Sequence, residues 1–312
     1  RASVVPMARY MEFNVGTAAK LHGETLPYLE GYTVYTLREA HGLTGHIVPW
    51  NYPMQIIGRS VGAALALGNC CVLKPAEEAC LSALMFAELA RQAGLPSGVL
   101  NVVPGLGAQA GAALAAHDGI NHLSFTGSVA TGRLVQAAAA QNVVPVTLEL
   151  GGKSPQILFE DADVAAALPF LINAGIQNAG QTCSASSRIL VQRSLYDTIV
   201  EAMAARYQTL VAKPAIEDGD LGPLISQRQK AIVENFLRQG HDLTLAATGQ
   251  ISDTAPAAGA YVKPHLFCDL APRHRLAQQE IFGPVQLIIP FDSAEEAVEI
   301  AKGNDHRLVA SL

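Results

Sequence analysis

The chain has 312 residues, of which 50% are apolar and 15% are charged, a charged share below the roughly 25% of a typical soluble protein. This length predicts about two domains, and so apolar a composition excludes an intrinsically disordered chain. The 21 lysines and arginines and the 27 aspartates and glutamates give a net charge of −6 without a dense basic stretch, which argues against a nucleic-acid or anionic-membrane surface.

Secretion and membrane insertion are not expected either. The longest apolar run, Val61–Leu73, contains Gly62, Gly68 and Asn69 and is too short to span a bilayer. The first thirty residues carry six charges and no continuous apolar block, so no secretory signal is expected. The 5 cysteines form no C-x-x-C pair, and an odd, sparse set is not a disulfide framework. We therefore expect a cytoplasmic protein.

The first forty residues show a mixed pattern, after which short apolar runs alternate with alanine-rich stretches. Strands are expected at 43–48, 70–73, 99–102, 121–125 and 143–148, and helices at 57–67, 82–92, 108–116 and 128–140. Strand–helix alternation at this spacing predicts an α/β domain with a doubly wound parallel sheet over residues 1–149. In such a sheet, ligands lie at the carboxyl ends of the strands, where helices begin.

A second α/β series, residues 150–312, follows the break at Gly151-Gly152. Asp161 and Asp163 are candidate caps of a helix that ends near Gln177. Further helices are expected at 195–210 and 294–302, strands at 189–191, 261–267 and 285–290, and a loop at 246–259. The last five residues have the pattern of a strand cut in its middle. We therefore expect the first domain to be incomplete at its N-terminus and the second at its C-terminus.

Two glycine-rich turns that follow predicted strands could hold a dinucleotide. Gly105, Gly107 and Gly111 have the spacing G-x-G-x-x-x-G, which departs from the usual fingerprint, so a tight turn with close helix packing is an equally good interpretation. Phe125–Ser128, followed by Gly132, could bring backbone and a hydroxyl to a phosphate at a helix N-terminus. The alternative is an ordinary helix cap.

Four polar residues are candidates for binding or chemistry. Lys74 and Glu77, three apart after a strand, could hold ribose hydroxyls or form a surface ion pair. Cys183 lies in a polar loop and is a better nucleophile candidate than a cysteine in an apolar run, although it could be a plain cysteine. Glu149 ends an apolar strand, so it either pairs with a cation such as Lys153 or has a raised pKa for work as a base. The 9 histidines lack metal-ligand spacing, so no metal site is expected.

Six short motifs resemble those of the NAD(P)-dependent aldehyde dehydrogenase superfamily, in the family's order and at its spacing. Each motif alone is a weak signal, but six in order are specific, and the resemblance covers essentially the whole chain. The motifs are Pro49-Trp50-Asn51-Tyr52-Pro53, Lys74-Pro75-Ala76-Glu77, Phe125-Thr126-Gly127-Ser128, Leu148-Glu149-Leu150-Gly151-Gly152-Lys153-Ser154-Pro155, Gly180-Gln181-Thr182-Cys183 and Glu280-Ile281-Phe282-Gly283-Pro284-Val285.

The resemblance implies a dinucleotide-binding domain at 1–149 and a catalytic domain at 150–312. It implies oxidation of an aldehyde to a carboxylic acid with NAD, or with NADP, through a cysteine thiohemiacetal and a thioester. Cys183 falls on the nucleophile, Glu149 on the general base and Asn51 on the oxyanion donor. The implied cofactor-binding positions are Trp50 and Phe125, Lys74 and Glu77 at the adenosine ribose, Gly107 and Gly111 near the adenine, Gly127, Ser128 and Gly132 at the pyrophosphate, and Glu280 and Phe282 at the nicotinamide. A homodimer or homotetramer is implied as well.

Three other interpretations stay open: a coenzyme A-acylating aldehyde dehydrogenase, a reductase that works in the reverse direction, and a non-catalytic or fragmentary NAD-binding protein. The acylating subgroup typically lacks a carboxylate where Glu149 stands, and the joint presence of Cys183, Glu149 and Asn51 argues against a dead site. The chain departs from the family at Ser60, where a lysine is frequent. It departs again at 305–308, where Tyr-Gly-Leu is expected.

Overall fold

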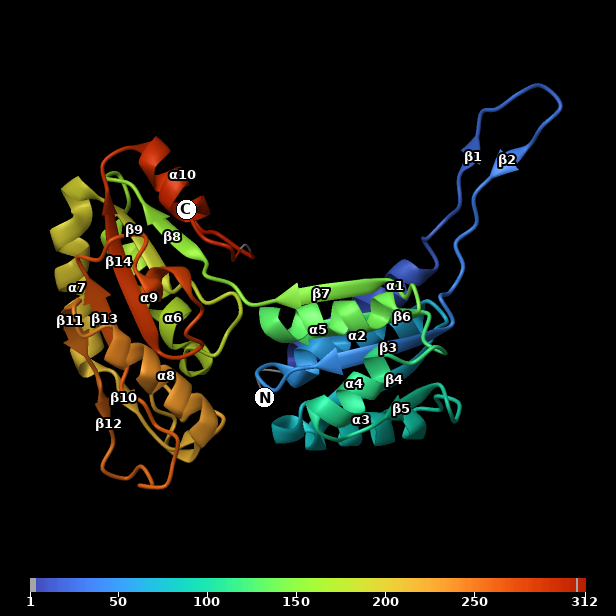
Figure 1. Cartoon of the computed structure of the whole chain (residues 1–312), viewed down its shortest axis with the longest axis horizontal. Coiled ribbons are helices and arrows are strands. Elements are labelled where there is room, and N and C mark those ends of the chain that lie inside the picture. The colour runs from blue at the N-terminus through green and yellow to red at the C-terminus, as the bar shows by residue number, and fades with distance from the viewer. Residues whose placement is uncertain (1–3, 307) are drawn as a thin grey trace. The chain divides into compact units, whose positions relative to one another are not determined.

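The computed structural model describes residues 4–306 and 308–312, and the chain folds into two compact units, Arg1–Leu150 and Gly151–Leu312 (Figure 1). Both units are mixed α/β structures with a largely parallel five-stranded sheet, so the predicted fold class is confirmed. In the described part of the chain, no helix is long and apolar enough to cross a membrane.

The sheet of the first unit is wholly parallel, with the strand order β5-β4-β3-β6-β7. The strands are β3 Leu43–Val48, β4 Cys70–Pro75, β5 Leu100–Val102, β6 His122–Gly127 and β7 Val146–Leu150. The chain winds outward from β3 to β5, returns to β6 on the other side of β3 and continues to β7. The strand order therefore reverses between β3 and β6, which is where doubly wound sheets bind their ligands.

Helices pack on both faces of this sheet (Figure 1). The helices are α2 Pro53–Ala66, α3 Leu81–Gln92, α4 Ala112–Ala115 and α5 Val129–Ala140, with a short 3₁₀ turn at Glu77–Ala79 and a π-helical turn at Gly107–Gly111. Successive strand residues point to opposite faces, so the apolar strand residues pack with the helices in two clusters. One cluster contains Leu73 of β4 and Ile57 of α2, and the other contains Leu123 of β6 and Val135 of α5. Pro53 at the first position of α2 suits a helix start, because the N–H that proline lacks would have no intrahelical acceptor there.

The mixed pattern of the first forty residues corresponds to a helix and a hairpin. Helix α1, Val4–Ala18, packs against α2, where a Cβ atom on Gly58 would lie only 3.0 Å from the Met7 Cα. Strands β1, Thr25–Leu26, and β2, Val34–Tyr35, form a two-residue antiparallel ladder. So short a ladder leaves no recognisable alternation in the sequence, which is why it was not predicted.

The sheet of the second unit has the strand order β11-β13-β14-β9-β8, parallel except for the antiparallel edge strand β11. The strands are β8 Pro155–Leu158, β9 Arg188–Gln192, β11 Thr244–Thr248, β13 His265–Cys268 and β14 Val285–Phe291, and a small separate pair joins β10 Val211–Ala212 to β12 Gln250–Ile251. The helices are α6 Val164–Ile176, α7 Tyr196–Thr209, α8 Gln227–Gln239, α9 Arg275–Gln278 and α10 Ala294–Lys302, and 3₁₀ turns lie at Gln177–Gly180, Arg193–Leu195 and Ala215–Glu217. Two buried apolar clusters fill the two sides of this sheet.

Several predicted boundaries in the second unit are wrong. The expected loop at 246–259 contains the end of β11 and all of β12, because small residues on an edge strand give no apolar run. The strand expected from Tyr261 begins only after Pro264, since proline cannot donate to the ladder. Asp163, not Asp161, caps α6, with its carboxylate accepting from Ala166 N at 3.1 Å. The final residues form a single bridge from Ser311 to β8.

A smaller correction concerns the strand predicted from Val143 in the first unit. Val143 has a left-handed φ of 57°, which a β-branched residue rarely adopts, and Pro145 follows it. Strand β7 therefore starts three residues later than expected, at Val146. The π-helical turn at Gly107–Gly111 likewise replaces the first part of the helix expected at 108–116.

A buried histidine in the first unit makes its stability depend on pH. His46 on β3 is 3% exposed, and its Nε2 lies 2.9 Å from the Thr44 Oγ1. Burial, helped by the nearby His122, lowers the pKa of His46 to about 4. The unfolded chain therefore takes up a proton on His46 near pH 6.5 that the folded chain refuses.

We predict that the unit loses about 2 kcal/mol of stability between pH 8 and pH 5 because of this one side chain. The loss begins near the pKa of the unfolded state and grows until the pH reaches about 4. His46→Gln retains a polar group toward Thr44 but cannot titrate, so its urea midpoint should fall less over the same range. Equal pH dependence in the two proteins would contradict the prediction.

Candidate active site

The loop that carries Cys183 is held in an unusual backbone conformation. It follows α6 through a 3₁₀ turn in which Asn178, Ala179 and Gly180 have left-handed φ values of 52°, 55° and 73°. Such a run is costly for residues with a Cβ atom and persists only where surrounding contacts enforce it. Here the Gln181 side chain makes such contacts. Its Nε2 donates to Asn178 O at 2.9 Å, and its Oε1 accepts from Ile225 N at 2.9 Å.

Gly180 is required by a close backbone approach. A Cβ atom at this position would lie 2.1 Å from the carbonyl oxygen of Gly283, so the loop and the 280–283 segment touch through bare backbone. A Cβ atom on Gly152 would similarly lie 2.5 Å from Cys183 O. The backbone of Cys183 is therefore fixed by neighbours that come close only because they are glycines.

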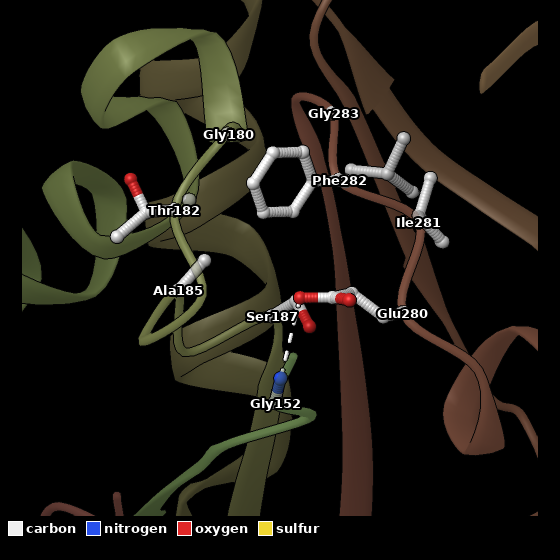
Figure 2. Close-up of a pocket in the computed structure, with 11 residues that line it drawn as sticks. Gly152, Gly180, Thr182, Ala185, Ser187, Glu280, Ile281, Phe282 and Gly283 are labelled. Carbon is white, nitrogen blue, oxygen red and sulfur yellow. Dashed lines mark hydrogen bonds between the residues drawn. The ribbon is translucent and has the colours of Figure 1, made fainter. Parts of the chain in front are cut away.

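A pocket lies between this loop and the 280–283 segment, and its empty space is about 290 Å³ with the open mouth included. Figure 2 shows the ring of Phe282 projecting toward the side of Gly180 and Thr182, and the Glu280 carboxylate beside Gly152. Phe282 has a left-handed φ of 56°, and its carbonyl accepts from the Gln229 Nε2 at 2.9 Å. The lining residues are Gly152, Gly175, Gly180, Thr182, Ala185, Ser187, Glu280, Ile281, Phe282, Gly283 and Val285.

Glu280 is the charged group of this pocket. Its Oε1 accepts a hydrogen bond from Gly152 N at 3.2 Å, and a Cβ atom on Gly151 would lie 2.0 Å from its Oε2. Burial raises the pKa of Glu280 to about 7, although the Gly152 hydrogen bond and the charge of Lys153 act in the opposite direction. The carboxyl group therefore changes charge close to neutral pH.

A buried basic pair, Lys153 and Arg188, lies next to the Gly151-Gly152 segment. Lys153 is wholly buried, and its Nζ has no hydrogen-bond partner in the part of the chain that the structure describes. Burial and the charge of Arg188 lower the pKa of Lys153 to about 7, against an opposing effect of Glu280. Arg188, 1% exposed, donates to the carbonyls of Lys153, Ile300 and Ala301 at 2.9 to 3.0 Å.

His306 and Leu308, in the segment where the sequence departs from the family, contact the Gly151-Gly152 segment. The His306 Nδ1 lies 3.4 Å from Gly151 O, and a Cβ atom on Gly152 would lie 3.2 Å from the Leu308 Cβ. Arg307, which belongs to this segment, lies outside the described residues. The His306 imidazole thus lies with Glu280 and Lys153 around the Gly151-Gly152 segment, a grouping that the sequence analysis did not predict.

In the first unit, the predicted residues lie at or just after the carboxyl ends of the five parallel strands. Trp50 and Asn51 come after β3, and Lys74 and Glu77 lie at the end of β4. Gly107 and Gly111 follow β5. Phe125, Gly127 and Ser128, with Gly132 in α5, lie around the end of β6, and Glu149 is the penultimate residue of β7. The carboxyl ends of parallel strands meet at the same edge, so this unit brings its predicted residues to one side of the sheet.

Lys74 and Glu77 form an ion pair between a buried lysine and a glutamate whose side chain is 43% exposed. The Lys74 Nζ lies 3.1 Å from the Glu77 Oε2, and Lys74 is only 3% exposed. Burial tends to raise the pKa of Glu77, but hydrogen bonds from its own backbone, from Lys74 and from the Gly107 backbone together hold it below its ordinary value. The Gly107 contact links the two predicted cofactor motifs to each other.

The glycines of the two candidate turns differ in their surroundings. A Cβ atom on Gly107 or Gly111 would meet nothing within 4 Å, so close packing does not account for either of them, and Gly105, with φ of 157°, is the residue that its turn requires. By contrast, a Cβ atom on Gly127 or Gly132 would lie 2.6 Å from the side chain of Phe125 or Leu150, respectively.

Ser128 is a helix cap in this structure. Its Oγ accepts from Thr131 N at 3.2 Å and lies 2.9 Å from the Thr131 Oγ1. The ordinary interpretation of Ser128 as a helix cap therefore holds, and its hydroxyl hydrogen is directed to the Thr131 Oγ1.

Glu149 has a different partner from the one predicted. Its Oε2 lies 3.8 Å from the Arg59 Nη1, and the side chains are 40% and 42% exposed, respectively. The cation beside Glu149 is therefore Arg59 of α2, not Lys153, and the carboxylate is half-exposed, not buried. Among residues 4–306 and 308–312, no three histidine, cysteine, aspartate or glutamate side chains gather in a way that could hold a metal ion.

Comparison with known proteins places the chain in a family. A model of the aldehyde dehydrogenase family matches residues 1–312, so the chain belongs to the aldehyde dehydrogenase family, as the six motifs predicted. A structure from Burkholderia cenocepacia, assigned as an aldehyde dehydrogenase, is 59% identical with a TM-score of 0.98 and covers 99% of this chain and 66% of its own. The NAD+ complex of an aldehyde dehydrogenase from Bacillus cereus is 40% identical with a TM-score of 0.93, over 99% of this chain and 62% of its own.

Among characterised sequences, the hydroxyisobutyraldehyde dehydrogenase of Mycolicibacterium austroafricanum is 39% identical over 314 residues, which is 100% of this chain and 62% of that protein. The chain thus spans 58–62% of the length of the curated relatives that it matches.

We predict that Gly180→Ala destabilises the protein by more than the ~1–2 kcal/mol that a left-handed backbone costs a residue with a Cβ atom, because the new methyl group would also collide with Gly283 O. Gly94→Ala is the matched control, since Gly94 has φ of 93° but open space around its missing Cβ atom. Unfolding free energies from denaturant titration would compare the two, and equal losses would contradict the prediction.

Proposed function

We propose that the protein oxidises an aldehyde to a carboxylic acid with NAD, with the unit at Gly151–Leu312 as the catalytic domain and the unit at Arg1–Leu150 as the dinucleotide-binding domain. The observation that carries this proposal is the Cys183 loop, which the backbone contacts at Gly152 and Gly180 hold beside a pocket. Such backbone rigidity suits a nucleophile whose position has to be fixed before the substrate arrives. Relatives named for aldehyde oxidation, such as the hydroxyisobutyraldehyde dehydrogenase, support the assignment.

The donor set of the first unit fits NAD. Lys74 and Glu77 form an ion pair, and the Gly107 backbone donates a hydrogen bond to the Glu77 carboxylate. A ribose with free hydroxyls could hydrogen-bond to both side chains. The open space at Gly107 and Gly111 leaves room for a ligand. A carboxylate at Glu77 repels a 2′-phosphate, which favours NAD over NADP. The structures of relatives in complex with NAD+ support this choice.

The chemistry assigned to the chain's own residues has two halves. In the first, the Cys183 thiolate adds to the aldehyde carbon, and the Asn51 amide, with a backbone N–H, donates to the oxyanion that forms. Bound NAD supplies the acceptor for the hydride that leaves this carbon. In the second half, Glu149 takes a proton from water, the hydroxide attacks the thioester carbon, and the Cys183 sulfur leaves.

We also propose that the protein forms homo-oligomers and acts in the cytoplasm. Large apolar side chains are exposed along the hairpin of β1 and β2, a surface that a second copy of the chain could cover. They are Leu21, Leu26, Tyr28, Leu29, Tyr32, Tyr35 and Leu37.

Cys183→Ala is expected to abolish NADH formation and leave the fold intact, because the thiolate is the nucleophile. Cys71→Ala is the matched control, since Cys71 is fully buried in the first unit. It should keep most of the activity but lose about 0.5–3 kcal/mol of stability. Absorbance at 340 nm with a simple aldehyde and NAD measures the first effect and thermal unfolding the second. A Cys183→Ala protein that kept most of its oxidation rate would rule out the covalent mechanism.

Glu149→Gln is expected to slow turnover by about 10²–10⁴-fold without weakening NAD binding. Since the glutamine cannot accept a proton, the thioester should accumulate and give a burst of NADH near one per active site before a slow steady state. A small strong nucleophile should partly restore the rate of the slow steady state, because it attacks the thioester in place of water. If coenzyme A restored it more efficiently than water and released an acyl-thioester, the acylating alternative would replace hydrolysis.

A further inference from the structure

Helix α2 brings a guanidinium to the carboxyl end of β7. The helix starts at Pro53, two residues after Asn51, and its seventh residue is Arg59. Glu149 is the penultimate residue of β7, at the edge of the same sheet. The two residues belong to one unit, and their side chains meet with an Nη1–Oε2 distance of 3.8 Å. The carboxylate to which we assign the base therefore rests against a positive charge.

This ion pair is of a kind that opens readily. At 3.8 Å the contact is longer than a hydrogen bond, so it is mainly electrostatic. Both side chains are more than one third exposed, at 42% and 40%, and water and salt screen the attraction. Such a pair restrains the direction of a carboxylate without locking it.

We propose that Arg59 is a positioning residue that restrains Glu149 in a resting orientation, and that this ion pair has to be given up when Glu149 acts as a base. The proposal rests on the proposed function, because it presumes the hydrolytic role of Glu149. No role in binding the substrate or the cofactor is assigned to Arg59.

The direction of the effect follows from the charges in the hydrolytic step. A water O–H bond breaks and its proton goes to Glu149, the hydroxide oxygen bonds to the thioester carbon, and the C–S bond breaks to give the carboxylic acid and the Cys183 thiolate. Glu149 is negative before the step and neutral after it, whereas Arg59 stays positive. The attraction between the two therefore stabilises the state before proton transfer more than the state after it, so Arg59 slows the release of the acid.

The test is a single-turnover experiment on the whole protein as its gene encodes it, with enzyme and NAD in excess over a simple aldehyde. Rapid quenching and chromatography follow the acid, and NADH absorbance follows the hydride step. Arg59→Gln removes the charge and Arg59→Lys retains it. Arg91→Gln is the matched control, because it breaks a surface ion pair with Glu88 on α3, away from the sheet edge.

We expect Arg59→Gln to release the acid about two- to five-fold faster than wild type at low ionic strength, which is the range that an exposed ion pair allows. Added salt should accelerate the wild type and Arg59→Lys toward the rate of Arg59→Gln, and it should leave Arg59→Gln unchanged. The rate and the amount of NADH formed in the single turnover should be the same in all four proteins. Arg91→Gln should behave as the wild type does.

Slower or unchanged acid release by Arg59→Gln would overturn the proposal, as would the same salt dependence with and without the guanidinium. Thermal unfolding shows whether a slow variant is merely misfolded, in which case Arg59→Lys and the salt dependence of the wild type decide. Failure of the proposed function has a different signature, because Glu149→Gln would then release the acid at the wild-type rate. An acceleration by Arg59→Gln that persists in the Glu149→Gln background would place the effect of Arg59 elsewhere and also overturn the proposal.

Discussion

The second unit depends on backbone segments that approach one another too closely for a Cβ atom. Gly180 lies against Gly283 O and Gly152 against Cys183 O, whereas Gly151 leaves room for the Glu280 side chain. These contacts join three segments that are far apart in the sequence, and they leave little freedom to the chain on either side of Cys183. Because a protein interior cannot absorb even a methyl group without displacing its neighbours, the backbone around Cys183 keeps its geometry only with glycine at 152 and 180.

The same crowding explains the electrostatics of the pocket. The Gly151-Gly152 segment leaves room for the Glu280 carboxylate, and the chain then passes directly into the core at Lys153. Burial favours the neutral form of each group, so it raises the pKa of Glu280 to about 7 and lowers the pKa of Lys153 to about 7. Each charge opposes the shift of the other, because the Lys153 ammonium favours the ionised Glu280 carboxylate and the carboxylate favours the protonated amine.

Sequence patterns predicted the regular parts of the fold well. Strand β3 and helix α10 lie where the pattern placed them, because a buried parallel strand gives a short apolar run and an amphipathic helix has a strong period. The hairpin β1–β2 and the edge strand β11 were missed, since two-residue ladders and strands of small residues give neither signal. The order of the motifs predicted the family. The motifs of the first unit also supplied the residues that the structure has at the carboxyl ends of the strands. The partner of Glu149 could not be predicted, because Arg59 is ninety residues away and in no motif, and only the folded sheet brings it to Glu149.

Arg188 shows how one side chain can tie distant segments into a single element. Its guanidinium donates to the carbonyl of Lys153, just before β8, and to two carbonyls in the last turn of α10, while its own backbone begins β9. A lysine has a compact ammonium group where arginine has a planar fork, so it could not reach all three carbonyls at once. The start of β8, the start of β9 and the end of α10 are thus fastened at one point, and their backbone amides should become accessible to solvent exchange together, as one cooperative unit, rather than one segment at a time.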